Sequence, residues 1–418
     1  MTATLWTTLF CTVLSLNLLT RLTLAFRQMR HVRQYRGAVP DSFSATIPLE
    51  AHQKAADYNL AKNRLSLVQI LLDGTVLLAL TLGGGLEWLQ HLLYGLVPYE
   101  LLRGGLFIVL TLTLISLLEL PLAWYQTFSI EARFGFNQMT PALFIADHVK
   151  QWLLGLALGL PLLYVVLWFM QTAGEMWWLY TWAVWVGFNL LIMAIFPTFI
   201  APLFNKFQPL EDLSLRQRIE GLLKRCGFHS NGVFVMDGSR RSSHGNAYFT
   251  GLGNSKRIVF FDTLLKQLSA EEIEAVLAHE LGHFKHHHIR KRMILMFSLS
   301  LVLLWVLSQL QQMHWFYQGL GVSQPDTAMA LLLFFLVLPV FTFLLHPLTS
   351  YHSRLHEYQA DSYAASQTPA RDLVSALIKL YRDNAATLTP DPWYSRYYDS
   401  HPPAPLRIAH LQAQGHNS

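Results

Sequence analysis

Residues 278–313 read AHELGHFKHHHIRKRMILMFSLSLVLLWVLSQLQQM, and this stretch joins two features of different kinds. Its first part holds five histidines within ten positions, which are His279, His283, His286, His287 and His288. Its second part, 293–313, contains no Asp, Glu, Lys or Arg and has the length of about 20 residues that a bilayer crossing requires. The sequence therefore places a candidate metal-binding segment directly before a membrane helix.

Apolar stretches of similar length recur along the chain. The 418 residues are 52% hydrophobic and only 14% charged, with a mean hydropathy of +0.30, whereas soluble domains carry about 25% charged residues. The first stretch is interpreted as a retained helix rather than a signal peptide, because it is long and its basic residues follow it. The predicted fold class is an all-α polytopic membrane protein. Its seven predicted transmembrane helices are 3–26, 66–94, 101–125, 151–171, 176–203, 293–313 and 328–348.

The positions of Lys and Arg predict the orientation in the membrane. The connection 27–65 carries seven of them and 204–292 is rich in them, whereas 172–175 and 314–327 carry none. Because cytoplasmic loops are enriched in Lys and Arg, we expect the N-terminus outside and the C-terminus in the cytoplasm. The net charge of +5 follows from this topology and gives no reason to expect nucleic-acid binding.

The topology also predicts how the chain is divided. Outside the membrane we expect an amphipathic helix at 212–227 and a small β-sheet whose edge strand could pair with an extended peptide. The predicted strands of that sheet are 232–236, 246–250 and 257–261. The segments are 1–203 with transmembrane helices 1–5, a cytosolic segment 204–292 with the histidine motif, 293–348 with helices 6 and 7, and a cytosolic segment 349–418.

The histidine motif lies on a predicted helix. Ser269 with Glu272 three residues later is a capping-box pattern, and basic residues gather in the last turns before Met293. We expect this helix either to run into the sixth membrane segment or to break just before it.

His279, Glu280 and His283 form the pattern His-Glu-x-x-His. On a helix, residues i and i+4 lie about 40° apart and one turn along the axis, so both imidazoles can reach one zinc ion. Glu280 lies about 100° round from His279, where it can hold a water rather than bind the metal. Zinc lowers the pKa of such a water toward about 7, and a carboxylate can take its proton as the water attacks a carbonyl. A helix with surface histidines is the alternative explanation.

A catalytic zinc ion needs a third protein ligand and one open position. The stretch SRLHEYQADSYAA, 353–365, is polar, helical in pattern and directly beyond the seventh membrane segment. Glu357 would complete a His₂Glu site, and Asp361 could accept a proton from the far nitrogen of a ligating histidine. The alternative is an exposed acidic helix paired with His356 or Arg354.

Six motifs in order give the chain a family resemblance. AHELGHFKHHH and EYQAD are accompanied by SIEARFGFNQMT (129–140), PTFIAPLFNKFQPL (197–210), DGSRRSSHGNAYFTG (237–251) and DSHPPAPLRIAHL (399–411). Together they resemble the integral-membrane zinc endopeptidases typified by the type I CAAX prenyl protease, the yeast a-factor converting enzyme, over nearly the whole chain.

The resemblance implies a zinc endopeptidase that cuts near the C-terminus of a lipidated or membrane-associated peptide. One zinc per chain would be held by His279, His283 and Glu357, with Glu280 as the base. The family also implies a large water-filled chamber enclosed by the seven helices. Polar residues within the membrane segments would then face water rather than lipid, where each costs several kcal/mol. These residues are Asp73, Glu87 and Glu119.

The resemblance suggests roles for three further residues. Asn246 and His401 would bind the substrate backbone or stabilise the oxyanion, and Arg407 would steady the metal-site carboxylates or the His401 loop. From the residues alone, Asn246 is equally a turn residue and His401, before two prolines, a rigid loop residue.

Several alternatives remain at this point. The compact loops and the C-terminal AQGHNS, which is not a retrieval signal, indicate a bacterial member in an inner membrane, so the natural substrate is open. A quality-control protease with the same site is a second possibility within enzymes. A metal transporter or receptor is a third, although its motif would be expected on pore-facing membrane helices. A structural protein with an inactive zinc site is disfavoured by the presence of Glu280.

The remaining histidines receive a different interpretation. His286 lies about 10 Å along the helix axis from His279, at 1.5 Å per residue, which is too far to share its metal ion. His287 and His288 are grouped with IRKR as a polar shoulder that faces the cytosol before the sixth membrane helix.

Overall fold

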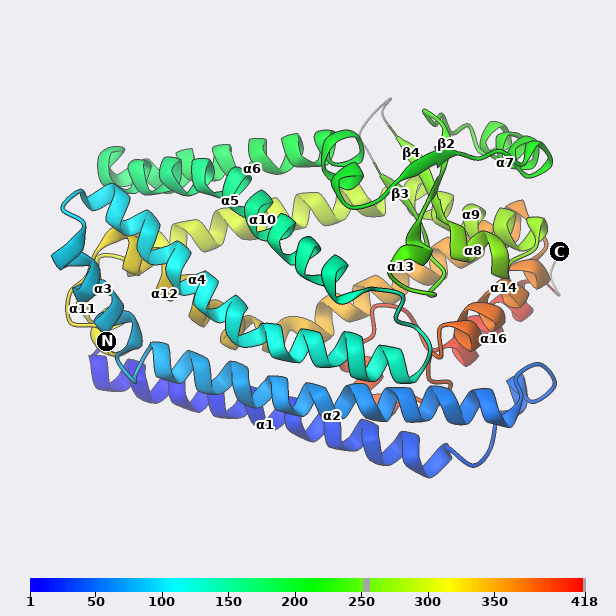
Figure 1. Ribbon diagram of the computed structural model, residues 1–418, viewed down its shortest axis with the longest axis horizontal. Helices are drawn as coiled ribbons and strands as arrows, with labels where there is room; N and C mark the ends of the chain where they lie inside the picture. The colour runs from blue at the N-terminus through cyan, green and yellow to red at the C-terminus, as the bar shows by residue number, and fades with distance from the viewer. Residues whose placement is uncertain (251–255, 416–418) are drawn as a thin grey trace.

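In the computed structural model, the chain forms an elongated bundle of long helices that ends in a smaller part containing a β-sheet (Figure 1). The structure describes residues 1–250 and 256–415, so the end of the AQGHNS stretch lies outside the described residues. In this part, seven helical spans are long and apolar enough to cross a membrane. The predicted class, a helical polytopic membrane protein with a small sheet, is confirmed. The principal helices of the seven spans are α1 (Ala3–Tyr35), α2 (Leu49–Leu80), α4 (Glu100–Tyr125), α5 (Pro141–Thr172), α6 (Trp177–Ile195), α10 (His288–Leu310) and α12 (Thr327–Thr342).

The second membrane helix differs from its predicted bounds of 66–94. Helix α2 ends at Leu80, and Gly84 then adopts a left-handed φ of 77°, which glycine reaches without steric strain. A separate helix, α3 (Gly85–Leu96), follows the turn, and Glu87 on it accepts a hydrogen bond from the backbone N–H of Ser323, 3.1 Å away. Glu87 thus lies outside the membrane spans, contrary to the expectation that it is an intramembrane residue.

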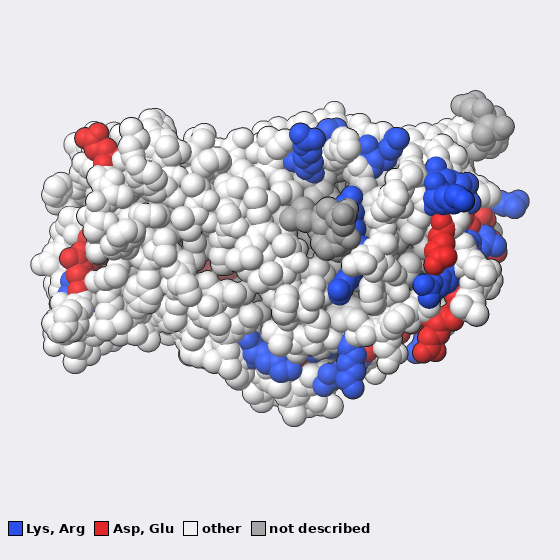
Figure 2. Space-filling model, turned by 90° about the horizontal axis from the view of Figure 1, so that it is seen from above, with Lys and Arg blue, Asp and Glu red and all other residues white. Residues whose placement is uncertain are grey.

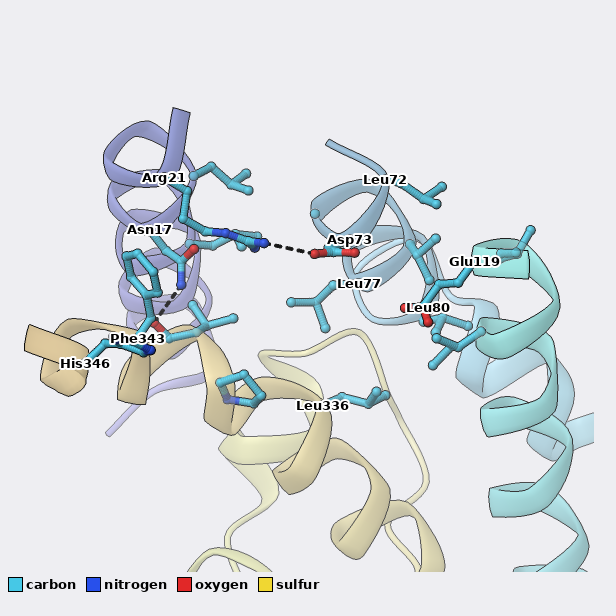
Figure 3. Close-up of a pocket in the computed structure, with 18 of the residues that line it drawn as sticks. Asn17, Arg21, Leu72, Asp73, Leu77, Leu80, Glu119, Leu336, Phe343 and His346 are labelled. Atoms are coloured by element: carbon cyan, nitrogen blue, oxygen red, sulfur yellow. Dashed lines mark hydrogen bonds and ion pairs between the residues drawn. The ribbon is translucent and has the colours of Figure 1, made fainter. Parts of the chain in front are cut away.

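A cavity of about 480 Å³, with a mostly apolar lining and a few polar side chains, lies among α1, α2, α4 and α12 (Figure 3). Figure 3 shows Arg21 of α1 reaching toward Asp73 of α2, and the two side chains form an ion pair of 3.1 Å. Gln69 donates a further hydrogen bond of 2.7 Å to Asp73, and Glu119 of α4 lines the same cavity. Pairing of this kind reduces the cost of charged groups at membrane depth. A chamber enclosed by all seven helices stays a prediction.

The sheet has four strands in the order β1-β2-β4-β3. β2 and β4 are parallel and the other two pairs are antiparallel, which leaves β3 as an edge strand. β1 was not predicted from the sequence, because it is three residues long and contains a proline, a residue confined to sheet edges. The strands are β1 (Phe207–Pro209), β2 (Val233–Met236), β3 (Ala247–Thr250) and β4 (Arg257–Phe261).

One hydrophobic core joins the sheet to helices from the two segments outside the membrane, 204–292 and 349–418. Ile219 of α7, Phe260 of β4 and Leu277 of α9 are almost fully buried in it, together with Leu373 of α14. Burial of such side chains stabilises the fold by about 1.5–3 kcal/mol each. Helix α9, which carries the histidine motif, is therefore packed against α7, α14 and the sheet in this core. The helices of this part are α7 (Leu213–Arg225), α8 (Asp262–Gln267), α9 (Ala270–Lys285), α13 (His346–Gln367), α14 (Ala370–Asp383), α15 (Pro392–Tyr398) and α16 (Ala404–Gly415), and α11 (His314–Gln318) lies at the other end.

The two ends of the bundle differ in charge. The N-terminus lies at the end opposite the sheet, and the C-terminal helices lie beside the sheet (Figure 1). Figure 2 shows most of the Lys and Arg on this face over the part with the sheet and α7, with some Asp and Glu among them, whereas the few charged residues visible at the opposite end are mostly Asp and Glu. This asymmetry is the one expected when the sheet end faces the cytoplasm.

Candidate metal centre and substrate cleft

The motif helix α9 is fixed at its start by a complete capping box. The backbone N–H of Ser269 donates to the Glu272 carboxylate at 2.7 Å, and the Ser269 hydroxyl accepts from the Glu272 N–H at 3.4 Å. Glu272 also accepts a hydrogen bond from Lys379 at 2.8 Å, which ties α9 to α14. The helix ends at Lys285, and the expected break before the membrane segment is found at His287, whose φ is 56°.

Helix α13 crosses α9 at Gly282, inside the His-Glu-x-x-His motif. A Cβ atom placed on Gly282 would lie 2.8 Å from the Cα of Ala360, so only the absence of a side chain allows this approach. The crossing places Glu357, one turn before Ala360, opposite the two motif histidines. A residue beyond the seventh membrane helix is thus brought into contact with the motif.

The structure brings His279, His283 and Glu357 into one cluster with ligand atoms within 4.8 Å of one another. The two Nε2 atoms lie 3.3 Å apart. Oε2 of Glu357 lies 3.5 Å from Nε2 of His279, and Oε1 lies 3.4 Å from Nε2 of His283. Glu357 is 3% exposed, and Nδ1 of His401 lies 2.7 Å from its Oε2.

These distances fit a tetrahedral metal ion. With metal–nitrogen and metal–oxygen bonds of about 2.0–2.1 Å, the edge of a tetrahedron is about 3.3–3.4 Å. The separation of the two Nε2 atoms, 3.3 Å, equals that edge length, and each histidine nitrogen has one oxygen of the Glu357 carboxylate at 3.4–3.5 Å. Two imidazoles and one carboxylate are also the donor set that suits zinc. The residues present therefore fit a catalytic zinc site with one open position.

Asp361 and Arg407 lie directly behind His279. Asp361 is fully buried and its Oδ1 is 2.8 Å from Nδ1 of His279, while Nε of Arg407 donates to its Oδ2 at 2.8 Å. Arg407, on α16, also lies 3.7 Å from Glu357. Burial lowers the pKa of His279, but Asp361 and Glu357 outweigh it and raise the pKa to about 9. A metal ion at this site must therefore compete with a proton.

Glu280 is partly exposed on α9, next to the cluster. No hydrogen bond or ion pair of its carboxylate is found among residues 1–250 and 256–415. Glu280 therefore lies beside the three clustered residues but is not one of them.

Asn246 and His401 share a cavity of about 820 Å³ beside the cluster. Asn246 is exposed and immediately precedes the edge strand β3, and His401 contacts Glu357 as described above. β3 is at the edge of the four-stranded sheet and pairs with β4. Tyr398 lines this cavity and the membrane cavity as well.

His244 and Asn384 were missed by sequence reasoning. Oδ1 of Asn384 accepts from the Gly245 N–H at 3.1 Å and lies 3.2 Å from Nδ1 of His244. The His244 ring stacks on Phe136 with a centroid distance of 4.3 Å. Together they hold the turn before Asn246. The clue in the sequence was that Phe136 and His244 both fall within family motifs.

His288 is placed differently from its prediction. It was expected to face the cytosol with the IRKR residues, yet it is only 3% exposed and lies against His283. The prediction failed because the chain reverses at His287, whose left-handed conformation the sequence pattern does not indicate.

A methyl group at position 282 is expected to disturb the metal cluster. In Gly282→Ala the new Cβ meets the backbone of Ala360, so α13 must move away, at a cost of about 1–3 kcal/mol, and carry Glu357 with it. We expect a lower melting temperature and weaker zinc binding, measured by thermal unfolding with and without zinc. Gly221→Ala in α7 is the control, because its nearest neighbour is the flexible Arg225 side chain at 3.7 Å. Unchanged zinc binding in Gly282→Ala would show that the crossing does not set the ligand positions.

Comparison with known proteins divides the chain into two matching parts. Residues 28–206 match a family model described as the CAAX prenyl protease N-terminal part with five membrane helices. Residues 209–414 match the model of peptidase family M48. The boundary between the two matches lies after α6 and its connection, where the chain leaves the membrane bundle for the sheet.

Curated relatives match over most of their length. The CAAX prenyl protease 1 homolog of Arabidopsis thaliana is 34% identical over 90% of this chain and 91% of its own. CAAX prenyl protease 1 of Saccharomyces cerevisiae is 39% identical over 73% of this chain and 71% of its own. The crystal structure of S. mikatae Ste24p superposes with a TM-score of 0.90 at 32% identity, covering 97% of this chain and 98% of that one. With both halves matched and the fold shared throughout, the chain belongs to peptidase family M48 and is a membrane metalloendopeptidase.

Proposed function

We propose that this protein is a zinc-dependent endopeptidase that cleaves near the C-terminus of CAAX-type substrates. The cluster of His279, His283 and Glu357 carries the zinc part of this proposal, because its ligand atoms lie within 4.8 Å of one another and its two Nε2 atoms are one tetrahedral edge apart. The substrate part is supported by the curated relatives, whose names describe CAAX prenyl proteases. One zinc per chain is expected, because one such cluster is found among the described residues.

The roles of the side chains follow from their positions. Zinc, when bound, supplies Lewis acidity that makes water nucleophilic near neutral pH. Glu280 accepts the proton of the attacking water and passes it to the leaving amine, a step worth about 10²–10⁴-fold in rate. His401 and Asn246, which line the same cavity, donate hydrogen bonds to the substrate carbonyls. Asp361 holds the proton on Nδ1 of His279, which leaves Nε2 free for the metal.

The topology completes the proposal. We place the N-terminus outside and the sheet, α9 and the C-terminal helices in the cytoplasm, which agrees with the Lys and Arg distribution in Figure 2. Segments 204–292 and 349–418 then form one catalytic part, since α13 and α14 pack on α9. A bacterial inner membrane is the proposed location, on the basis of the compact loops.

A pair of peptides tests the proposal. The purified protein is given a farnesylated peptide that ends in a CAAX sequence and its unlipidated twin, and the cuts are located by mass spectrometry, with metal content measured in parallel. We expect one zinc per chain and faster cleavage of the farnesylated peptide. Equal cleavage of both would contradict lipid recognition. If neither is cut while unfolded membrane proteins are degraded, a quality-control role replaces the CAAX role.

A further inference from the structure

The two histidine ligands have different partners behind them. A histidine that binds zinc through Nε2 must carry its proton on Nδ1, and the group that accepts this proton fixes the orientation of the ring. For His279 that group is the Asp361 carboxylate, 2.8 Å from Nδ1. Among residues 1–250 and 256–415 no carboxylate contacts Nδ1 of His283, and this atom lies 3.0 Å from Nδ1 of His288.

The proton positions in the contact between His283 and His288 follow from the residue on the other side of His288, which is Gln359. Nε2 of His288 lies 2.8 Å from Oε1 of Gln359, an oxygen that can only accept. His288 therefore carries its proton on Nε2 and presents a lone pair on Nδ1. His283 donates its Nδ1 proton to that lone pair, which leaves Nε2 of His283 as a free donor atom in the metal cluster. Each hydrogen bond in the series has one donor and one acceptor.

The His288 ring is held rigidly enough for this task. His356, on α13 next to Glu357, stacks on it with a centroid distance of 3.9 Å and an angle of 12°. His286 is nearly parallel to it as well, at 5.5 Å and 16°. His288 is the first residue of α10 and is 3% exposed, so little water competes for its nitrogens. The left-handed turn at His287 is what directs the ring back toward α9.

We propose that His288, oriented by Gln359, is a positioning residue that fixes the tautomer and ring direction of the metal ligand His283. This inference rests on the proposed zinc site and adds to it a neutral counterpart of the Asp361 contact. The contact between His288 and His283 also connects the proposed metal site to the first turn of the sixth membrane helix, α10. A movement of α10 would therefore move the His283 ring through one hydrogen bond.

Two substitutions at position 288 separate positioning from packing. His288→Ala removes the acceptor, and we expect the zinc dissociation constant to rise about 10- to 100-fold, as for other partners of metal ligands. His288→Asn keeps an oxygen close to the position of Nδ1 and is expected to restore most of the affinity. His352→Ala, on the exposed part of α13, is the matched control and should bind zinc as the unchanged protein does.

The readouts are zinc affinity by chelator competition, the absorption spectrum of the cobalt-loaded protein, and the melting temperature with and without zinc. A positioning role predicts a smaller zinc-induced rise in melting temperature for His288→Ala and an altered cobalt spectrum, both recovered in His288→Asn. The inference is overturned if His288→Ala binds zinc normally, or if both variants lose affinity only in proportion to a loss of stability of the metal-free protein. If the unchanged protein binds no zinc, the proposed metal site itself is wrong. If the unchanged protein binds zinc and cleaves its peptide, and His288→Ala binds zinc equally well, only the role of His288 is refuted.

Discussion

Glu280→Gln is expected to keep its zinc and to lose peptide cleavage. The glutamine amide has almost the same shape but cannot accept the proton of the attacking water, so kcat/KM should fall by about 10²–10⁴-fold. The metal ligands are untouched, because Glu280 lies outside the cluster of His279, His283 and Glu357. Metal analysis of the purified variant and cleavage of the farnesylated peptide provide the two measurements.

A Glu-to-Gln substitution at another position of α9 is the control for Glu280→Gln. Glu271→Gln alters a carboxylate of the first turn that forms a surface ion pair with Arg218, and it should retain full activity. His279→Ala, by contrast, should lose both zinc and cleavage. If Glu280→Gln cleaves at the normal rate, Glu280 is not the base and the mechanism proposed above is wrong.

Removal of the Arg407 guanidinium is expected to have the largest effect on stability. Arg407 is 6% exposed and forms two contacts with the fully buried Asp361. In Arg407→Met the Asp361 charge would keep only His279 as a partner, and breaking a buried pair in this way costs about 3–5 kcal/mol. We expect a clear drop in the melting temperature of the metal-free protein, measured in detergent, and weaker zinc binding.

Two further substitutions sharpen that result. Arg407→Lys keeps the charge but not the paired N–H groups that face the carboxylate, so an intermediate loss is expected. Arg382→Met removes a half-exposed surface partner of Asp383 and should change stability by no more than about 1 kcal/mol. Stability of Arg407→Met equal to that of Arg382→Met would show that the buried pair does not support the fold.

Local patterns predicted most of the cluster. The capping box of Ser269 and Glu272 and the His-Glu-x-x-His spacing are short-range features, because helical geometry alone determines which side chains share a face. Glu357 could be found because a polar helix directly after the last membrane segment was the natural source of a third ligand. The structure places it 3.4–3.5 Å from the two histidines.

The residues that were missed depend on single backbone angles or on distant contacts. His288 was assigned to the cytosolic shoulder because one left-handed residue, His287, redirects the chain, and no periodic pattern signals such a residue. Asn384 contacts the turn before Asn246 across some 140 positions of sequence, so no local pattern could connect them. Glu87 was misplaced because a four-residue turn within an apolar run divides one predicted helix into two.

The position of Glu357 on α13, beyond both α10 and α12, has a consequence for biosynthesis. The two motif histidines are made before the last two membrane helices, whereas Glu357, Asp361 and Arg407 are made after them. A growing chain therefore carries two thirds of a metal site until the whole bundle has been inserted, and two histidines without the carboxylate hold zinc weakly. With the proposed ligands, cleavage is therefore expected only after the chain has been made past Arg407 on α16.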